Sequence, residues 1–227
     1  VRTIAKRHGL HASFMPKPRY GVNGSGMHIN MSLLKDGKNI FADEKGTHGL
    51  SRDAYAFLGG VMEHMRGMTA IMNPIVNSYK RLVPGFEAPA YIAWSATNRS
   101  ALIRIPAAVG DAVRMELRSP DPTANPYLAL AAVLRAGLDG IKRQTPVPES
   151  VDCNIFHMSE QERSARKIEE LPGTLAEAVS CMEKDGFMRK MLGDHVFEKY
   201  IALKKEEWNR YRSQVTDWEI NEYLNRF

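Results

Sequence analysis

Several features that define particular protein classes are scarce or absent in this chain of 227 residues. Two cysteines, Cys153 and Cys181, are too few for a disulfide framework or a cysteine-rich zinc site. No apolar run approaches the ~20 residues that a membrane-spanning helix needs. The opening residues, VRTIAKRHGLH, lack the hydrophobic core of a secretory leader. We therefore expect a cytoplasmic protein with reduced thiols and no membrane partner.

Neither charge nor aromatic content points to a nucleic-acid partner. The net charge is only +5, and aromatic residues make up 8% of the chain. The arginines have few aromatic neighbours and follow no recognition-helix pattern, so we expect no nucleic-acid binding. A mild positive charge is compatible with a pocket for small anions.

The glycine-rich fingerprints of common nucleotide sites are absent as well. GVNGSG, at residues 21–26, lacks the Lys-Ser/Thr ending of a P-loop and the glycine spacing of a dinucleotide-binding turn. The chain begins with Val1 and not with an initiator methionine, as though in the middle of a secondary-structure element. We therefore expect it to be a fragment of a longer protein.

The order of local patterns predicts an α+β fold, with an antiparallel sheet packed with helices. Strand-like alternation occurs in residues 26–34, 101–106 and 114–120, and Asp36-Gly37 is a hairpin turn signal.

Helix start signals divide the remainder of the chain. Ser51 and Asn125 are expected N-caps of two long helices, and Pro126 suits the first position of the second. That second helix is rich in small apolar residues and should be well buried. From about residue 159 onward the chain is predicted to be helical. Three capping boxes are expected there: Ser159 with Glu162, Thr174 with Glu177, and Thr216 with Glu219.

Two of the predicted strands have a polar face. In residues 26–34, His28, Asn30 and Ser32 share one parity, and apolar residues occupy the other. If the strand at 114–120 lies in the same sheet, His28 and Glu116 meet over one cavity, where an imidazole and a carboxylate suit Mn²⁺ or Mg²⁺. The residues alone leave open that both faces are the solvent-exposed side of a sheet.

Five arginines crowd into the middle of the chain: Arg81, Arg99, Arg104, Arg114 and Arg118. Guanidinium forks bind carboxylate and phosphate oxygens in pairs, and several of them beside a divalent ion suit phosphoryl transfer. Solvated surface charges are the alternative. In the loop after Pro84-Gly85, Glu87 is either a proton acceptor with a raised pKa or an ordinary surface acid.

Four long motifs make the chain resemble glutamine synthetase of the bacterial type I form. NGSGMH, NSYKRLVPGFEAP, NRSALIRIP and RMELRSPDPTANPYLALAAVL match that family's motifs in order and spacing. The resemblance implies a glutamine synthetase/guanido kinase-like catalytic domain over residues 1–227. The family's N-terminal β-grasp domain and the upstream part of its catalytic domain would be absent.

The resemblance also implies an activity. Members form L-glutamine from L-glutamate and ammonia through γ-glutamyl phosphate, with ATP as substrate and two Mg²⁺ or Mn²⁺ ions. Full-length members form dodecamers of two hexameric rings, and residues 216–227 resemble the terminal helix that reaches into the opposite ring. Because the remaining metal ligands lie upstream in the family, we expect this chain alone to make no glutamine.

Residue roles follow from the same resemblance. His28 and Glu116 would bind the metal ion associated with ATP. Glu87, on the flap that closes over glutamate, and Arg99, at the transferring phosphoryl group, would be catalytic. Glutamate would be contacted by Asn23, Gly24, Arg81 and Arg118. The ATP site would be lined by Ser32, Asn30, Arg99, Arg104 and Arg114.

Two positions depart from the family pattern. Asn30 replaces a second histidine of many members and cannot become cationic. Phe156, in Asn154-Ile155-Phe156, occupies the place of a tyrosine that is nucleotidylated in regulated members. Since Phe156 has no hydroxyl group, we predict that this chain is not controlled in that way.

Two alternative functions remain open. A ligase on the same scaffold that joins glutamate to a polyamine or another amine would share the metal and ATP residues. A non-catalytic structural or regulatory homologue is the other alternative. The combination of Glu87, Arg99 and Arg118 argues against a non-catalytic homologue, because a structural protein does not need this combination of charged residues.

Overall fold

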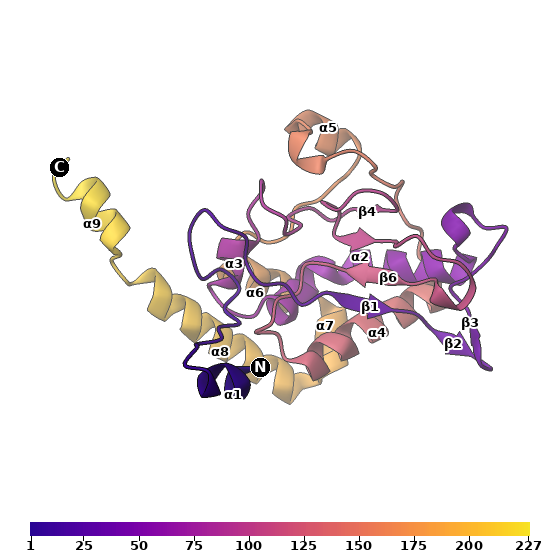
Figure 1. Ribbon diagram of the computed structural model, residues 1–227, viewed down its shortest axis with the longest axis horizontal. Helices are drawn as coiled ribbons and strands as arrows, with labels where there is room; N and C mark the ends of the chain where they lie inside the picture. Colours follow the sequence, from indigo (N-terminus) through magenta and orange to yellow (C-terminus); the bar gives the residue numbers. More distant parts are fainter.

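The computed structural model describes residues 1–227 and has an α+β architecture, with a small sheet in front of a layer of helices (Figure 1). The strands are β1 (Ile29–Met31), β2 (Leu34–Lys35), β3 (Lys38–Asn39), β4 (Trp94–Ser95), β5 (Ile103–Arg104) and β6 (Met115–Leu117). The helices are α1 (Arg2–Arg7), α2 (Arg52–Met72), α3 (Ser78–Arg81), α4 (Pro126–Arg143), α5 (Glu160–Ala165), α6 (Leu175–Lys184), α7 (Gly186–Leu192), α8 (Asp194–Arg212) and α9 (Asp217–Tyr223). Three short 3₁₀ helices complete the set: η1 (Thr47–Gly49), η2 (Gly110–Ala112) and η3 (Ile155–His157).

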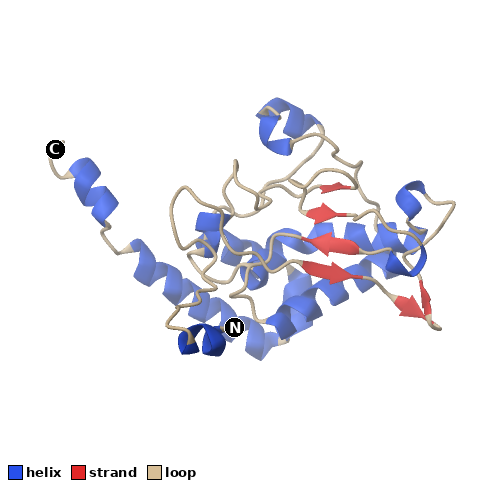
Figure 2. Ribbon diagram, viewed as in Figure 1, coloured by secondary structure: helices blue, strands red, loops and turns tan.

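The main sheet has the strand order β1-β6-β5-β4 (Figure 2). Strand β6 pairs in antiparallel fashion with both β1 and β5, as the sequence predicts, whereas β4 and β5 are parallel. Residues 96–102 lead the chain back along the sheet before β5 begins, which gives the two strands one direction. The α+β prediction is confirmed, and the antiparallel prediction is wrong for the β4–β5 pair.

The predicted turn at Asp36-Gly37 joins β2 to β3. The φ angles of 52° at Asp36 and 77° at Gly37 are those of a hairpin turn in which both central residues are left-handed. Glycine adopts this conformation without steric cost, and aspartate tolerates it better than most residues.

Helices α2 and α4 begin where the sequence predicts. The Ser51 hydroxyl accepts a hydrogen bond from Ala54 N at 3.1 Å, and the Asn125 side chain accepts one from Tyr127 N at 3.0 Å. The two helices cross at a pair of glycines. A Cβ at Gly60 would lie only 2.7 Å from the Cα of Gly140, so the helices approach each other backbone to backbone.

The expectation that α4 is well buried holds for only one face of the helix. Its inner face, which includes Ala129, Ala132 and Ala136, is buried against the core. Its outer face leaves four large side chains exposed: Tyr127, Leu130, Leu134 and Leu138. The small apolar residues identify the buried face of the helix, but they do not show whether the outer face is also covered.

The C-terminal third is helical, as predicted. Ser159 with Glu162 and Thr216 with Glu219 form reciprocal capping boxes. Thr174 caps α6, but the Glu177 carboxylate bonds to Gly173 N instead of closing the third box. Helix α8 runs along the lower edge of the molecule in this view, and α9 stands off at the end of it (Figure 1). No helix combines the length and the apolar character needed to cross a membrane.

Candidate active site

The pairing of β1 with β6 brings an imidazole and a carboxylate together. His28 immediately precedes β1, and Glu116 is the central residue of β6. The Nδ1 atom of His28 lies 2.9 Å from Oε1 of Glu116. Side chains alternate as predicted: Ile29 and Leu117 point into the core, while His28 and Asn30 are exposed.

Strand β5 adds a guanidinium to this pair. Arg104 lies opposite Glu116 in the sheet, and its Nε atom is 2.8 Å from the second carboxylate oxygen, Oε2. The N–H bond does not point at that oxygen, so Oε2 is buried without a hydrogen-bond partner. The Arg104 guanidinium is therefore an ion-pair partner of Oε2, and Oε1 is the oxygen that faces His28.

The geometry of His28 and Glu116 suits a shared divalent cation in part. In an octahedral shell, ligand atoms about 2.1 Å from the metal ion are about 3.0 Å from adjacent ligand atoms. This is close to the 2.9 Å between Nδ1 of His28 and Oε1 of Glu116. No group of three or more His, Cys, Asp or Glu side chains in residues 1–227 could hold a metal ion. The chain therefore supplies two candidate ligands, which is fewer than a divalent ion needs.

Two connected hollows open beside this pair. The larger has a volume of about 540 Å³ and contains Glu116, Arg99 and Arg104 among its walls. The smaller, of about 250 Å³, is walled by Gly24, Arg81 and other residues of the same loops. Five residues line both: Asn23, His28, Phe86, Glu87 and Arg118.

The glycine loop of residues 21–26 forms one wall. Ser25 N donates a hydrogen bond to Pro16 O at 2.9 Å, which folds the loop back on residues 16–17. A Cβ at Gly24 would collide with that same carbonyl oxygen, so only glycine fits there. This close approach brings Asn23 and Gly24 to the smaller hollow.

Two buried arginines line the same hollow, and Arg81 lies against the glycine loop. Arg81, from α3, donates to the carbonyl oxygens of Ser119 at 2.5 Å and Arg118 at 3.2 Å. Arg118 is 7% exposed, and its Nη1 atom is buried without a partner. Burial lowers the pKa of both guanidinium groups from the ordinary value; Asp121 opposes this at Arg81 and Glu116 opposes it at Arg118.

The loop that carries Glu87 covers both hollows. Gly85 has a φ of +92°, a conformation that side-chain-bearing residues rarely adopt, and it turns the chain so that Phe86 and Glu87 face the hollows. Beneath this loop lies Lys17, which is buried and lines the smaller hollow. Lys17 was not predicted as a site residue; a lysine between two prolines, next to the glycine loop, was the available signal.

Arg99 is presented by a loop that is hydrogen-bonded to a distant segment. The carboxylate of Asp152 accepts hydrogen bonds from the hydroxyl groups of Ser95 at 2.6 Å and Thr97 at 3.2 Å. The bond from Ser95 lowers the pKa of Asp152 from its ordinary value. Asn98 donates to the carbonyl oxygen of Cys153 as well. These contacts fix the segment from Ser95 to Ser100 and hold Arg99 at the rim of the larger hollow.

Three predicted ATP-site residues lie outside both hollows. Asn30 and Ser32 continue the exposed face of β1 beyond His28. Arg114 donates to the carbonyl oxygen of Ala112 at 3.1 Å, within its own segment. Strand parity predicts that they share a face with His28 and Glu116, but it does not show where the hollow ends.

Phe156 and Asn154 line the larger hollow near Arg99. The Asn154 side chain caps η3 by accepting a hydrogen bond from Phe156 N at 3.1 Å, and the Phe156 ring packs against Tyr91 at a centroid distance of 6.1 Å. The absence of nucleotidylation at Phe156 stays a prediction.

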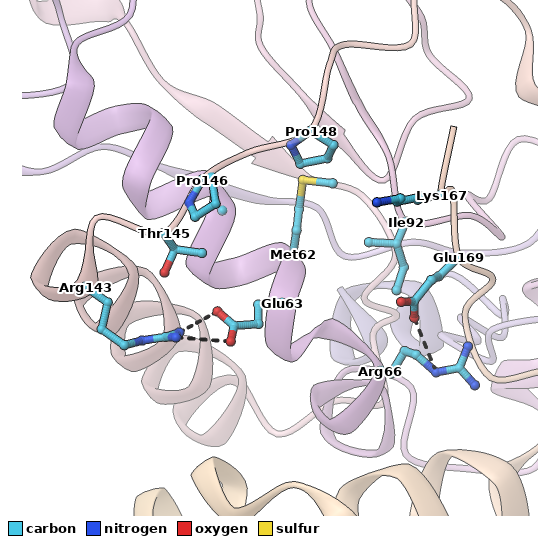
Figure 3. A pocket seen from close by; sticks show the side chains of 11 residues that line it. Met62, Glu63, Arg66, Ile92, Arg143, Thr145, Pro146, Pro148, Lys167 and Glu169 are labelled. Atoms are coloured by element: carbon cyan, nitrogen blue, oxygen red, sulfur yellow. Dashed lines mark hydrogen bonds and ion pairs between the residues drawn. The ribbon is translucent and has the colours of Figure 1, made fainter. Parts of the chain in front are cut away.

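Another hollow of about 500 Å³ lies between α2, the end of α4 and residues 167–169, away from these groups (Figure 3). Four of its five charged side chains are paired with each other: Arg143 contacts Glu63, and Arg66 contacts Glu169 at 4.0 Å, while Lys167 forms no ion pair. The groups suited to chemistry are therefore gathered at His28 and Glu116 instead.

Comparisons with known proteins agree with the motifs. A family model described as "Glutamine synthetase, catalytic domain" matches residues 1–223. A glutamine synthetase of Clostridium saccharobutylicum is 58% identical over 227 residues, and one of Staphylococcus aureus (strain MW2) is 53% identical over the same length. Both alignments include 100% of this chain and 51% of the relative, so the chain spans about half the length of these relatives.

Solved structures give the same result for the fold. A structure described as "Apo GmaS without ligand" superposes with a TM-score of 0.86 at 41% identity, over 99% of this chain and 50% of that one. A second, described as "GmaS/ADP complex-Conformation 1", superposes with a TM-score of 0.87 at 41% identity, over 98% of this chain and 51% of that one.

Proposed function

This chain belongs to the glutamine synthetase family, and we propose that it carries the glutamate-binding wall and part of the metal and ATP sites of a ligase that forms L-glutamine. The substrates are L-glutamate, ammonium and ATP. The reaction proceeds through γ-glutamyl phosphate, which ammonia converts to glutamine with release of phosphate.

The observation that carries this proposal is the unpartnered Nη1 of Arg118. A buried guanidinium nitrogen without a partner is costly, and a carboxylate oxygen of a bound substrate would satisfy it. Arg81 and Lys17 line the same hollow, so that three cationic side chains surround it. A dicarboxylate such as glutamate suits this charge better than a neutral amino acid does.

The remaining side chains have complementary roles in the proposal. His28 and Glu116 hold a Mg²⁺ or Mn²⁺ ion, with further carboxylates from the part of the relatives' length that this chain does not span. The ion, when bound, neutralises charge on phosphate oxygens. Arg99 and Arg104 face the phosphoryl group, and Glu87 accepts a proton from ammonium.

ATP extends from the larger hollow along the exposed face of the sheet, toward Asn30, Ser32 and Arg114. The 41% identical structure of a GmaS/ADP complex supports a nucleotide site on this fold. In the proposal Asn30 contacts the nucleotide as a neutral hydrogen-bonding group.

We test this function by reconstitution. The half of the C. saccharobutylicum relative that this chain does not match is joined ahead of Val1, and glutamine formation is measured with ATP, Mg²⁺, glutamate and ammonium. The expected result is glutamine formation by the chimera and none by residues 1–227 alone. Parallel reactions with putrescine and methylamine measure the competing amine-ligase function. A faster reaction with either amine than with ammonium would identify that amine as the acceptor.

Assembly into two stacked hexameric rings is part of the same proposal. Helix α9 has no buried residue and exposes Trp218 and Tyr223, and Phe227, four residues beyond the helix, is exposed as well. Apolar surface of this kind is usually covered by a partner. Light scattering of the chimera, with and without residues 216–227, measures the assembly. A dodecamer is expected only with the helix.

A further inference from the structure

Lys17 occupies an unusual position for a lysine. Its side chain is 8% exposed, and it forms no ion pair with a carboxylate. Its Nζ atom donates to the carbonyl oxygen of Val22 and lies 3.7 Å from the centroid of the Phe86 ring. An ammonium group removed from water needs replacement partners, and here one carbonyl oxygen and one aromatic face supply them.

The backbone of Lys17 is fixed independently of its side chain. Lys17 N donates to Oδ1 of Asn77 at 2.8 Å, and Nδ2 of Asn77 donates back to Lys17 O at 3.0 Å. Asn77 directly precedes α3, the helix that carries Arg81. The ammonium group is therefore held from a rigid base.

The loop above Lys17 has few restraints of its own. Val83, Pro84, Gly85 and Glu87 are exposed, and no backbone N–H of residues 85–88 donates a hydrogen bond. Segments with this character open easily. The contact between Lys17 and Phe86 joins the loop to the body one residue before Glu87.

We propose that Lys17 is a positioning residue: by attracting the Phe86 ring it holds the Glu87 loop closed over the smaller hollow, while its bond to Val22 O holds the glycine loop at the opposite wall. The proposal rests on the proposed function for its catalytic consequence, but the closed loop itself does not depend on it. One buried cation thus joins three segments of the site.

The catalytic consequence concerns water. An open loop admits water to γ-glutamyl phosphate, and water then attacks the acyl phosphate and yields glutamate and inorganic phosphate. ATP is consumed, and no glutamine forms. Weakening the contact therefore raises the ratio of phosphate released to glutamine formed.

The first experiment measures loop opening in the chain without catalysis, by the rate at which a thiol reagent labels a cysteine at the buried position 88. Ala88→Cys is made in a chain whose own cysteines are replaced by serine, Cys153→Ser and Cys181→Ser, and each variant below is compared in this background. Lys17→Met keeps the length and packing of the side chain and removes the charge. Labelling at position 88 is expected to become about 3- to 30-fold faster, the range of a partly desolvated cation–π contact. Lys17→Arg, which retains a cation, should be labelled at the parent rate. Lys184→Met removes an exposed lysine at the end of α6 that forms no ion pair, and is the control.

Phe86→Leu removes the same contact from the exposed side and decides the question if Lys17→Met does not fold. Each variant should speed labelling at position 88, and the double variant should add little to either single change. An unchanged labelling rate in both single variants would overturn the proposal. So would an equal rise in the labelling of Ala70→Cys in the core of α2, which indicates general destabilisation.

The second experiment uses the chimera and measures phosphate and glutamine together. Lys17→Met should raise the phosphate-to-glutamine ratio several-fold, while Lys17→Arg should leave the ratio near the parent value. A parent chimera that makes no glutamine would refute the proposed function, and the labelling experiment would still decide the role of Lys17. A lowered turnover with an unchanged ratio would refute the role in excluding water.

Discussion

The Nδ1 atom of His28 and the Oε1 atom of Glu116 lie 2.9 Å apart, although 88 residues separate them in the chain. The contact exists because β1 and β6 are adjacent strands in antiparallel register, with Asn30 opposite Glu116. It turns two alternating sequence patterns into one polar surface beside a hollow.

We predict that Glu116→Gln weakens Mn²⁺ binding by the chimera at least about tenfold. Replacing residues that merely support metal ligands already costs about 10- to 100-fold, and here a proposed ligand loses its charge. Titration followed by electron paramagnetic resonance of free Mn²⁺ measures the affinity. Glu44→Gln, on an exposed loop, is the control. Equal affinities for the two variants would remove Glu116 from the proposed metal site.

The Arg118 guanidinium is expected to set the affinity for glutamate. Arg118→Lys keeps the charge but loses the fork geometry, and one charged hydrogen bond is worth about 10- to 100-fold in binding. We expect KM for glutamate to rise by that factor in the chimera, with KM for ATP changed much less. Arg135→Lys, on the exposed side of α4, should change neither. A larger effect on ATP than on glutamate would contradict the assignment.

The ionisation of Asp152 should make the free energy of unfolding depend on pH in the acid range. Hydrogen bonds, above all from Ser95, lower the pKa of Asp152 below its ordinary value of 3.8, so the unfolded chain takes up the proton first. The contribution to the free energy of unfolding is complete above that value and is lost as pH falls through the lower folded pKa. Urea unfolding of the parent and of Asp152→Asn should therefore differ most above pH 4 and converge below it. A difference that does not shrink in acid would show that another group is responsible.

The crossing of α2 and α4 should not tolerate a methyl group. Gly140→Ala places a Cβ against the backbone of Gly60, and overpacking of this kind costs about 1–3 kcal/mol. Gly186→Ala is the matched control, because a Cβ there meets nothing within 4 Å, and it should change stability by less than about 0.5 kcal/mol. Urea denaturation measures both, and equal stabilities would show that the helices can separate at little cost.

The local elements of this protein could be predicted from its residues. Helix starts at Ser51 and Asn125, the Asp36-Gly37 turn and the polar parity of His28 were all readable, because caps, turns and strand alternation depend on residues a few positions apart. The ordered motifs also identified the family, which the comparisons confirm.

Which of these elements meet depends on the folded molecule as a whole. The parallel pairing of β4, the exposed outer face of α4 and the positions of Asn30, Ser32 and Arg114 outside the hollows are not properties of any local window. The contact between Lys17 and the ring of Phe86, 69 positions further along the chain, is not a local property either. Such contacts form between distant segments, and their geometry depends on how the entire core packs.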